Sequence, residues 1–481
     1  METLRENVFA STHPELLKHF GHLAERLCQH FETLRSMPVN PRPKLEEVQK
    51  SLSFFTLGED RFSLEDLIRR FTGDLSRYLL HVDHPMYFGV FNPNPLFPGV
   101  LAEALVAQVN AQLASSASAL YAIEIEKKLI AYLGEKIGYS PDHLDGTFCT
   151  GGTEANLTAV LCALWRRCPE FFTSGARHLR QPLAVYSSVE THHSIKKALR
   201  LLGLGNESLR IIDTDTHLRF SCARLQEQIR EDQQQGYRPI LVVATLGSTS
   251  VGVIDPIEDL ARLARASEAD LHVDAAWGGG AVLLPELATA LTGLGNADSV
   301  TIDAHKWFAA PMTAGIFISR HSGILRSVFN IGESPYMPPS SYRDALTEPF
   351  AESLQWSRRF MGLKLLFPLL TLGEAGYQEL FRHSMSLATH FRHLLRAGES
   401  WDILNETPLP VVCFRPKGIM DKDAIEAFAE EINASGEAWI TTTHIGNRRE
   451  AVLRVGFPNF ATEETHVQQL FALLQSRRSR L

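Results

Sequence analysis

Residues 270–279 read DLHVDAAWGG and residues 299–307 read SVTIDAHKW, and these two segments decide the fold. Each begins with a short run rich in apolar and β-branched residues that ends at an aspartate, Asp274 or Asp303. Such runs are typical of buried strands when helical patterns separate them. The helical pattern of residues 257–266 precedes the first segment and is long enough for the crossover that parallel strands require. The two segments therefore predict an α/β fold with a mainly parallel sheet.

The rest of the sequence adds further strands and a helical segment before them. Other short β-rich runs occupy residues 183–187, 240–245 and 314–318. Near the start of the chain, apolar residues recur at three- and four-residue steps, which places them on one helix face. These residues are Leu16, Phe20, Leu23, Leu27, Phe31 and Leu34.

The last part of the chain mixes helical and strand patterns, which suggests a small α+β unit. Helical patterns cover 421–432 and 462–474, and short strands cover 411–415 and 451–455. We predict an N-terminal helical segment (1–92), a large α/β domain (93–368) and a small C-terminal α+β domain (369–481).

The composition indicates a globular protein that works on small molecules. The chain has 481 residues, of which 44% are hydrophobic and 21% charged, and its formal net charge is −8. Nucleic acids and anionic membranes attract basic surfaces, so an acidic chain is a poor partner for either. No apolar run is long enough to span a membrane, and the N-terminus lacks the apolar stretch of a secretory signal.

The six cysteines are scattered and include no Cys-x-x-Cys pair. This usage is typical of reduced thiols and offers no framework for a structural metal site. We therefore expect a cytoplasmic protein without a metal, a nucleic-acid partner or a membrane partner.

Two chemically distinctive residues follow strands at the edge where open parallel sheets bind ligands. Asp274 ends one strand, and a carboxylate there can pair with a protonated pyridine nitrogen. Lys306 follows the next strand, and lysine forms Schiff bases with carbonyl groups. Each residue also has an ordinary explanation, since the aspartate could cap a turn and the lysine could be solvated. Their positions on successive strands favour one shared pocket, which suits pyridoxal 5'-phosphate (PLP).

Three further segments offer groups that such a cofactor needs. Gly152 precedes a helical pattern, and free N–H groups at a helix start bind anions such as phosphate; the alternative is an ordinary cap at Thr153. His192 follows a strand and can stack on a pyridine face, although a single histidine is more often structural. Ser248 supplies a hydroxyl, or else belongs to an ordinary turn.

With these motifs the sequence resembles the group II, fold type I, PLP-dependent amino-acid decarboxylases. Members of this family act on aromatic amino acids, histidine, glutamate and diaminobutyrate. The resemblance covers most of the chain and rests on ordered motifs: His84–Gly89, Gly151–Asn156, Thr191–Ser194, Asp274–Trp277, His305–Trp307, Arg358–Lys364 and Leu453–Asn459. It implies a PLP-dependent transferase-like fold and a homodimer whose active sites lie at the subunit interface.

The resemblance also implies a role for each matching residue. Lys306 would form the Schiff base with PLP, and Asp274 would pair with the pyridine nitrogen. His192 would stack on one face of the ring, with Ala276 against the other. The phosphate and the ring oxygen would be held by four residues: Gly152, Thr153 and His305 at the phosphate, and Ser248 near the ring oxygen.

Family members carry a catalytic tyrosine on a mobile loop before the Arg358–Lys364 stretch. Tyr336 is the closest match in this sequence, and Tyr342 is the competing candidate. The alternative is a surface loop whose tyrosines only pack.

The sequence departs from the family at the phosphate and at the substrate. Many aromatic decarboxylases have Asn where this chain has Asp303, so a carboxylate near the phosphate needs a compensating donor or an outward rotamer. The predicted substrate contacts are Val90, Phe91 and Asn92. Val90 replaces the tyrosine of aromatic enzymes and the glutamine of glutamate enzymes, which leaves the substrate open.

We therefore expect PLP-dependent decarboxylation of an L-amino acid to the amine and carbon dioxide, with a proton from Tyr336, His192 or Lys306. One alternative is a PLP-dependent lyase or aminotransferase, because the same lysine and acid serve all of these reactions. Another is a non-catalytic regulatory protein on the same fold. The presence of both Asp274 and Lys306 argues against the latter.

Overall fold

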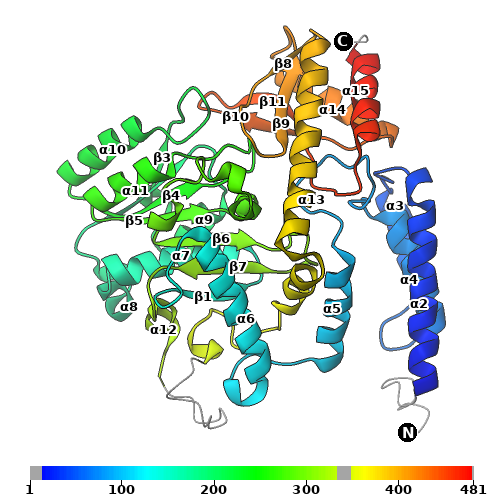
Figure 1. The fold of residues 1–481 in the computed structure, drawn as a ribbon, viewed down its shortest axis with the longest axis horizontal. Helices are drawn as coiled ribbons and strands as arrows, with labels where there is room; N and C mark the ends of the chain where they lie inside the picture. Colours follow the sequence, from blue (N-terminus) through cyan, green and yellow to red (C-terminus); the bar gives the residue numbers. More distant parts are fainter. Residues whose placement is uncertain (1–12, 333–347, 479–481) are drawn as a thin grey trace.

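A seven-stranded mixed sheet forms the centre of the computed structural model, which describes residues 13–332 and 348–478 (Figure 1). Its strand order is β1-β7-β6-β5-β4-β2-β3. Strand β7 runs antiparallel to both β1 and β6, and the other pairs are parallel. The strands are β1 (Asp145–Cys149), β2 (Leu183–Ser188), β3 (Leu209–Ile212), β4 (Arg238–Thr245), β5 (Asp270–Asp274), β6 (Ser299–Asp303) and β7 (Gly315–Ser319). The predicted α/β class with a mainly parallel sheet is confirmed.

Helices cover both faces of this sheet because its central strands are apolar on both sides. Along β4, Leu241 and Val243 pack with α7 and α9, whereas Val242 and Ala244 pack with α10 and α11. Successive side chains of a strand point to opposite faces, so a continuous apolar run needs a covering layer on each side. The covering helices are α7 (Gly152–Arg167), α9 (Ser194–Leu201), α10 (Cys222–Gln234) and α11 (Ile257–Ala266), and two shorter helices are α8 (Glu170–Ser174) and α12 (Ile324–Phe329).

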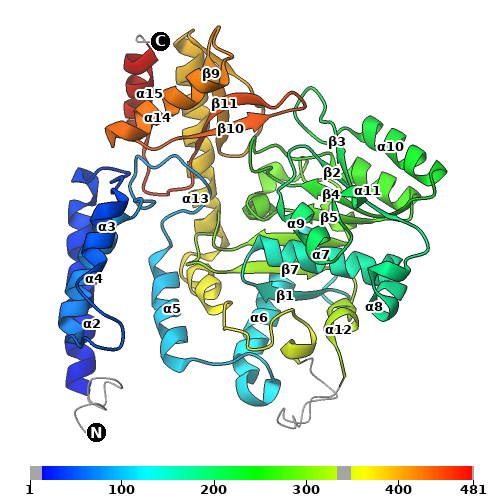
Figure 2. The same cartoon turned by 180° about the vertical axis from the view of Figure 1, so that it is seen from behind.

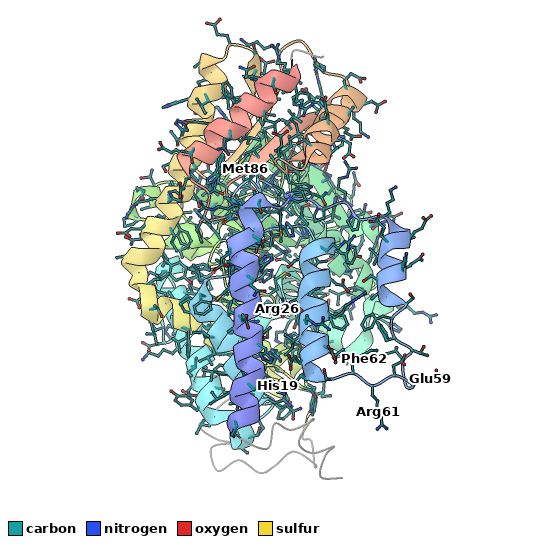
Figure 3. All side chains as sticks on the ribbon, turned by 90° about the vertical axis from the view of Figure 1, so that its right-hand side faces the viewer. His19, Arg26, Glu59, Arg61, Phe62 and Met86 are labelled. Atoms are coloured by element: carbon teal, nitrogen blue, oxygen red, sulfur yellow. The ribbon has the colours of Figure 1, made fainter. Side chains whose placement is uncertain are left out.

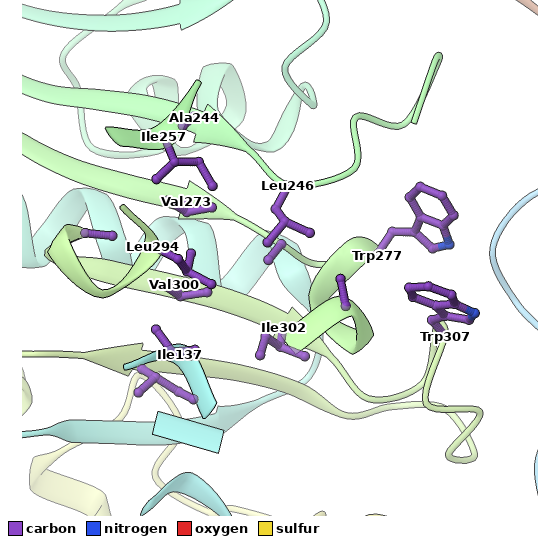
Figure 4. Packing of buried hydrophobic residues seen from close by; sticks show 14 of the residues in the cluster. Ile137, Ala244, Leu246, Ile257, Val273, Trp277, Leu294, Val300, Ile302 and Trp307 are labelled. Carbon is purple, nitrogen blue, oxygen red and sulfur yellow. The ribbon is translucent and has the colours of Figure 1, made fainter. Parts of the chain in front are cut away.

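The ends of β5 and β6 are anchored in the core (Figure 4). Val273, Val300 and Ile302 from these strands are fully buried. Trp277 and Trp307, from the turns that follow, stack with their ring centroids 6.1 Å apart. This apolar packing holds the two turns that carry the chemically distinctive residues.

Helix α13 (Leu363–Ala397) runs along the molecule from the large sheet to a second sheet (Figure 2). The second sheet is antiparallel, with the order β10-β11-β9-β8. It consists of β8 (Trp401–Ile403), β9 (Val411–Pro416), β10 (Thr441–Ile445) and β11 (Glu450–Gly456), with α14 (Lys422–Ser435) and α15 (Glu464–Arg478). The predicted small α+β unit is therefore present, and the predicted boundary at residue 369 falls inside α13.

The N-terminal helices lie at one side of the molecule, where α2 and α4 run side by side (Figures 1 and 3). The helices at this side are α2 (His13–Thr33), α3 (Leu45–Leu52) and α4 (Leu64–Tyr78). The next two are α5 (Phe97–Val109), which packs on α13, and α6 (Ser116–Ile137), which packs on β1. His19 and Arg26 lie on α2, and Glu59, Arg61 and Phe62 lie in the turn before α4 (Figure 3). No helix among the described residues combines the length and the apolar character needed to cross a membrane.

Candidate active site

Loops from six strands meet at one edge of the large sheet and line a cavity of about 460 Å³. Five of these loops follow the carboxyl ends of β1, β2, β4, β5 and β6, which point the same way. Because β7 is antiparallel, the residues just before it, Met312 and Thr313, lie at the same edge. The topology therefore collects side chains that are far apart in sequence into one site, as open α/β sheets do.

Asp274 is the last residue of β5, and its side chain is buried. Its Oδ2 accepts a hydrogen bond from Nδ2 of Asn156 at 2.8 Å, and its Oδ1 accepts one from the backbone N–H of Ala276 at 3.1 Å. Both donors are neutral, and no described residue forms an ion pair with this carboxylate. Its charge is therefore available to a cationic group of a ligand.

Asn156 connects Asp274 to two other polar groups of the site. It is fully buried, and its Nδ2 donates to Asp274 Oδ2 and to Ser194 Oγ, both at 2.8 Å. Its Oδ1 lies 3.0 Å from Nε2 of His272 and accepts from it, because an amide oxygen cannot donate. Burial lowers the pKa of His272 to about 4, so this histidine is neutral near pH 7. All the hydrogens of the Asn156 amide are thus committed.

The same network sets the tautomer of His192. The backbone N–H of Ser194 donates to Nδ1 of His192 at 3.2 Å, so this nitrogen carries no proton. The Ser194 hydroxyl, which accepts from Asn156, lies 2.9 Å from the same nitrogen. Burial lowers the pKa of His192, which favours the neutral ring. The ring proton therefore resides on Nε2, and the cavity has a histidine N–H donor.

Asp303 ends β6, and Lys306 lies in the turn that follows. Nζ of Lys306 is 3.0 Å from Oδ2 of Asp303, and Nε2 of His305 is 3.7 Å from the same oxygen. The Asp303 side chain is only 2% exposed, so the carboxylate does not take the outward rotamer considered above. Lys306 is the compensating donor, and Oδ1 of Asp303 has no hydrogen-bond partner among the described residues.

The start of α7 lies against Asp303 and the turn after β5. A Cβ placed on Gly152 would lie 3.0 Å from Asp303 Oδ2 and 3.2 Å from the Ala276 Cβ. A Cβ placed on Gly315 would lie 2.6 Å from the Gly151 Cα, so the approach of this turn to β7 requires glycine. The first N–H groups of a helix have no intrahelical acceptor and bind anions. The helix cap is Gly151 and has no side-chain cap bond, so the alternative of a Thr153 cap is not what the structure has.

The cavity collects most of the predicted site residues, whose individual roles stay predictions. Its lining includes Asn92, Gly152, Thr153, His192, Asp274, Ala276, His305 and Lys306. Ser248, Val90 and Phe91 do not line it. Ser248 is buried, Phe91 packs on Trp277, and Val90 is 43% exposed. Tyr336 and Tyr342 lie outside the described residues.

Sequence reasoning assigned no role to Asn156, Met312 or Thr313, which also line the cavity. The sequence did contain a sign that a residue such as Asn156 is needed. His272 and Asp274 are two residues apart on a buried strand, so their side chains face the same side of the sheet. Two polar groups on one buried face need a polar partner. Met312 and Thr313 precede a strand, and only the antiparallel direction of β7 brings them to the site.

The side chains present fit PLP. Lys306 offers an amine for its aldehyde, Asp274 offers a charge that no described residue pairs with, and the start of α7 offers N–H groups for a phosphate. The buried Thr245 Oγ1 and Ser248 Oγ have no hydrogen-bond partner in the part of the chain that the structure describes. Buried polar groups normally have partners, so the Thr245 hydroxyl, which lines the cavity, indicates room for a polar ligand. The fold and the site together define the class of PLP-dependent enzymes.

Comparison with known proteins specifies the family. Residues 55–417 match the model of the pyridoxal-dependent decarboxylase conserved domain. The match covers most of the chain, and this protein belongs to the pyridoxal-dependent decarboxylase family. PLP is therefore its cofactor, and PLP-dependent decarboxylation of an amino acid is its reaction. The alternatives of another PLP reaction or of a non-catalytic protein are not favoured.

Curated relatives and solved structures agree with this assignment. An aromatic-L-amino-acid decarboxylase from Bacillus atrophaeus is 29% identical over 94% of this chain and 93% of its own length. Tyrosine decarboxylase 2 from Arabidopsis thaliana is 27% identical over 97% of this chain and 87% of its own length. The structure of Oryza sativa TDC with PLP and tryptamine superposes with a TM-score of 0.91 at 23% identity, covering 98% of this chain and 99% of that one. The last comparison supports the predicted fold.

Proposed function

We propose that the cavity at the edge of the large sheet is the active site, with Lys306 bonding the aldehyde carbon of PLP and Asp274 pairing with its ring nitrogen. One observation carries this proposal: both residues, from the ends of successive strands, line the same cavity of about 460 Å³. The bound cofactor supplies an electron sink for the bond that breaks when the carboxylate leaves as carbon dioxide. The protein supplies position, charge and protons.

Residues that lie near Lys306 and Asp274 take the remaining roles in cofactor binding. His192 and Ala276 flank the ring, and the N–H groups of Gly152 and Thr153 receive the phosphate. Two further groups complete the proposed binding site: His305 beside the phosphate and the Ser248 hydroxyl near the ring oxygen. The unpartnered Ser248 Oγ supports this role, because a buried hydroxyl gains a partner there.

A proton must reach the carbon atom that loses the carboxylate. His192 holds its proton on Nε2, and Lys306 would offer a free amine whenever it is not bonded to the cofactor. Either group can act as the general acid. Tyr336 is the third candidate on sequence grounds.

We propose an aromatic L-amino acid as the substrate, with Val90, Phe91 and Asn92 near its side chain. In the described residues the cavity lining contains one lysine and no arginine, and burial lowers the pKa of His192 and of His305. Among these lining residues, no cation is therefore free for a side-chain carboxylate. The Phe91 ring, 4.4 Å from that of Trp277, adds apolar surface beside the site. Relatives named for aromatic and tyrosine substrates agree with this choice.

We also propose a cytoplasmic homodimer with active sites at the subunit interface. Large apolar side chains are exposed on α2 and α5, including Phe20, Phe31 and Val109. Exposed apolar patches of this kind mark interaction surfaces. The six cysteines are unpaired, which agrees with a reducing compartment. Light scattering of the wild type should give the mass of two chains, and a Phe20→Glu, Phe31→Glu variant should dissociate; a monomeric wild type would contradict the dimer.

A decarboxylation screen tests the proposed reaction and substrate class. The enzyme, supplied with PLP, is incubated with aromatic, acidic and basic L-amino acids, and carbon dioxide and amine are measured. We expect turnover of aromatic substrates alone. Lys306→Ala should abolish both turnover and the absorbance of lysine-bound PLP, whereas the exposed Lys197→Ala on α9 should keep both. An active Lys306→Ala variant would exclude the proposed site.

A further inference from the structure

Asp303 occupies an unfavourable position for a carboxylate in a phosphate-binding enzyme. It is 2% exposed, and its Oδ2 lies 3.0 Å from where a Cβ of Gly152 would be. It therefore lies against the first residues of α7, whose N–H groups are the proposed phosphate donors. Two negative groups this close together repel each other strongly where water is excluded.

The same carboxylate holds the amine that must bond the cofactor. Oδ2 of Asp303 is 3.0 Å from Nζ of Lys306. The lysine amine therefore forms an ion pair with a buried carboxylate. Within residues 13–332 and 348–478, no arginine and no second lysine lines the cavity, so no other strong cation can take over Asp303. Burial lowers the pKa of the neighbouring His305, which weakens it as a counter-ion. Lys306 must leave Asp303 in order to bond the aldehyde carbon.

We propose that Asp303 is a positioning residue that holds the Lys306 amine in the cofactor-free enzyme and weakens the binding of the cofactor phosphate. This inference rests on the proposed active site. Its consequence is a cofactor affinity lower than the rest of the site would allow, so that the enzyme loses PLP more readily. The unpartnered Oδ1 agrees with a carboxylate that is not fully stabilised where it lies.

The test compares two cofactor forms in the cofactor-free protein. Dissociation constants of PLP and of pyridoxal, which lacks the phosphate, are measured by quenching of the tryptophan fluorescence, because Trp277 lines the cavity. Asp303→Asn should tighten PLP binding about tenfold or more, and should tighten pyridoxal binding by a smaller factor. Asp303→Ala should act in the same direction, and Asp303→Glu, which keeps the charge, should not tighten PLP binding.

A merely structural aspartate would give the opposite sign, because its loss would loosen the site. Unchanged or weaker PLP binding in both neutral variants would overturn the proposal, and equal tightening for PLP and pyridoxal would overturn its phosphate part. Asp145→Asn is the matched control, since Asp145 is a partly buried carboxylate at the start of β1 and does not line the cavity. Failure of Lys306→Ala to lose the lysine-bound absorbance would instead exclude the active site itself, so the two failures are distinguishable.

Discussion

Replacing Asn156 by Ala should destabilise the cofactor-free protein and loosen its cofactor site at the same time. Among the described residues, Asn156 is the one that bonds Asp274, Ser194 and His272 together, through 2.8, 2.8 and 3.0 Å contacts. A methyl side chain can make none of these contacts. The substitution therefore tests whether the hydrogen bonds of Asn156 hold Asp274 and His192 in the positions proposed for contact with the cofactor ring.

The size of the effect follows from what each partner loses. Oδ2 of Asp274 loses a charge-assisted hydrogen bond in a buried place, which costs roughly 1.5–3 kcal/mol. Ser194 and His272 each lose a neutral hydrogen bond worth roughly 1 kcal/mol. The Thr301 hydroxyl, 3.3 Å from His272 Nε2, recovers part of this. We expect the free energy of unfolding to fall by roughly 4 kcal/mol.

Unfolding of the cofactor-free protein over a series of urea concentrations, at one fixed protein concentration, measures this loss of stability. A fluorescence titration measures the PLP affinity. Asn433→Ala is the matched control, because Asn433 makes two hydrogen bonds with the Ile440 backbone in the small domain. The control should lose roughly 1–2 kcal/mol and bind PLP normally. The reasoning would be refuted by an Asn156→Ala protein that loses less than about 1 kcal/mol and binds PLP as tightly as the wild type.

Three further outcomes are expected. Asp274→Asn should lower kcat by roughly a thousandfold, about 4 kcal/mol, in a steady-state amine assay, because the ring nitrogen loses its counter-ion; an unchanged kcat would remove Asp274 from the mechanism. The folded-state pKa of His272, about 4, lies below its usual 6.5, so the unfolded chain takes up a proton first and stability should decline as the pH falls from 6.5 to 4. This decline, at most roughly 3 kcal/mol, should be absent from the acid unfolding curve of His272→Gln. Gly315→Ala should weaken PLP binding in a titration, since its Cβ would lie 2.6 Å from the Gly151 backbone; equal affinity would show that the turn can shift without loss.

Sequence patterns predicted the interior strands of both sheets and missed the outer ones. Strands β5 and β6 were predicted with their observed limits, because central strands of a parallel sheet are buried on both faces and read as continuous apolar runs. The strands without a prediction were β1, β3, β8 and β10, and each is the outermost strand of its sheet. An edge strand has one neighbour and tolerates polar residues, as Asp145 and Thr147 in β1 illustrate. Periodicity alone does not find such strands.

The site was predictable wherever a residue directly follows a strand. Asp274 is the last residue of β5, while Lys306 follows β6 and His192 follows β2. The rule that ligands bind at the carboxyl ends of parallel strands therefore locates all three. Asn156 differs because its function depends on contacts with Ser194 and His272, which are 38 and 116 positions away. No local pattern encodes which buried amide meets which carboxylate across a sheet. Sequence could supply the proposed reacting groups but not the network that orients them.

Asp274 and Asp303 show how one residue type acquires two roles at equivalent places. Each ends a parallel strand, each is buried, and the two strands are neighbours in the sheet. Asp274 is held by an amide and a backbone N–H, which orient the carboxylate without neutralising it, so its full charge can stabilise a cationic ring nitrogen. Asp303 forms an ion pair with the Lys306 amine, so the charge of its carboxylate is neutralised until that amine moves away. With the roles proposed here, the hydrogen-bond or ion-pair partner, and not the strand end, decides which aspartate would serve the chemistry and which one would oppose cofactor binding.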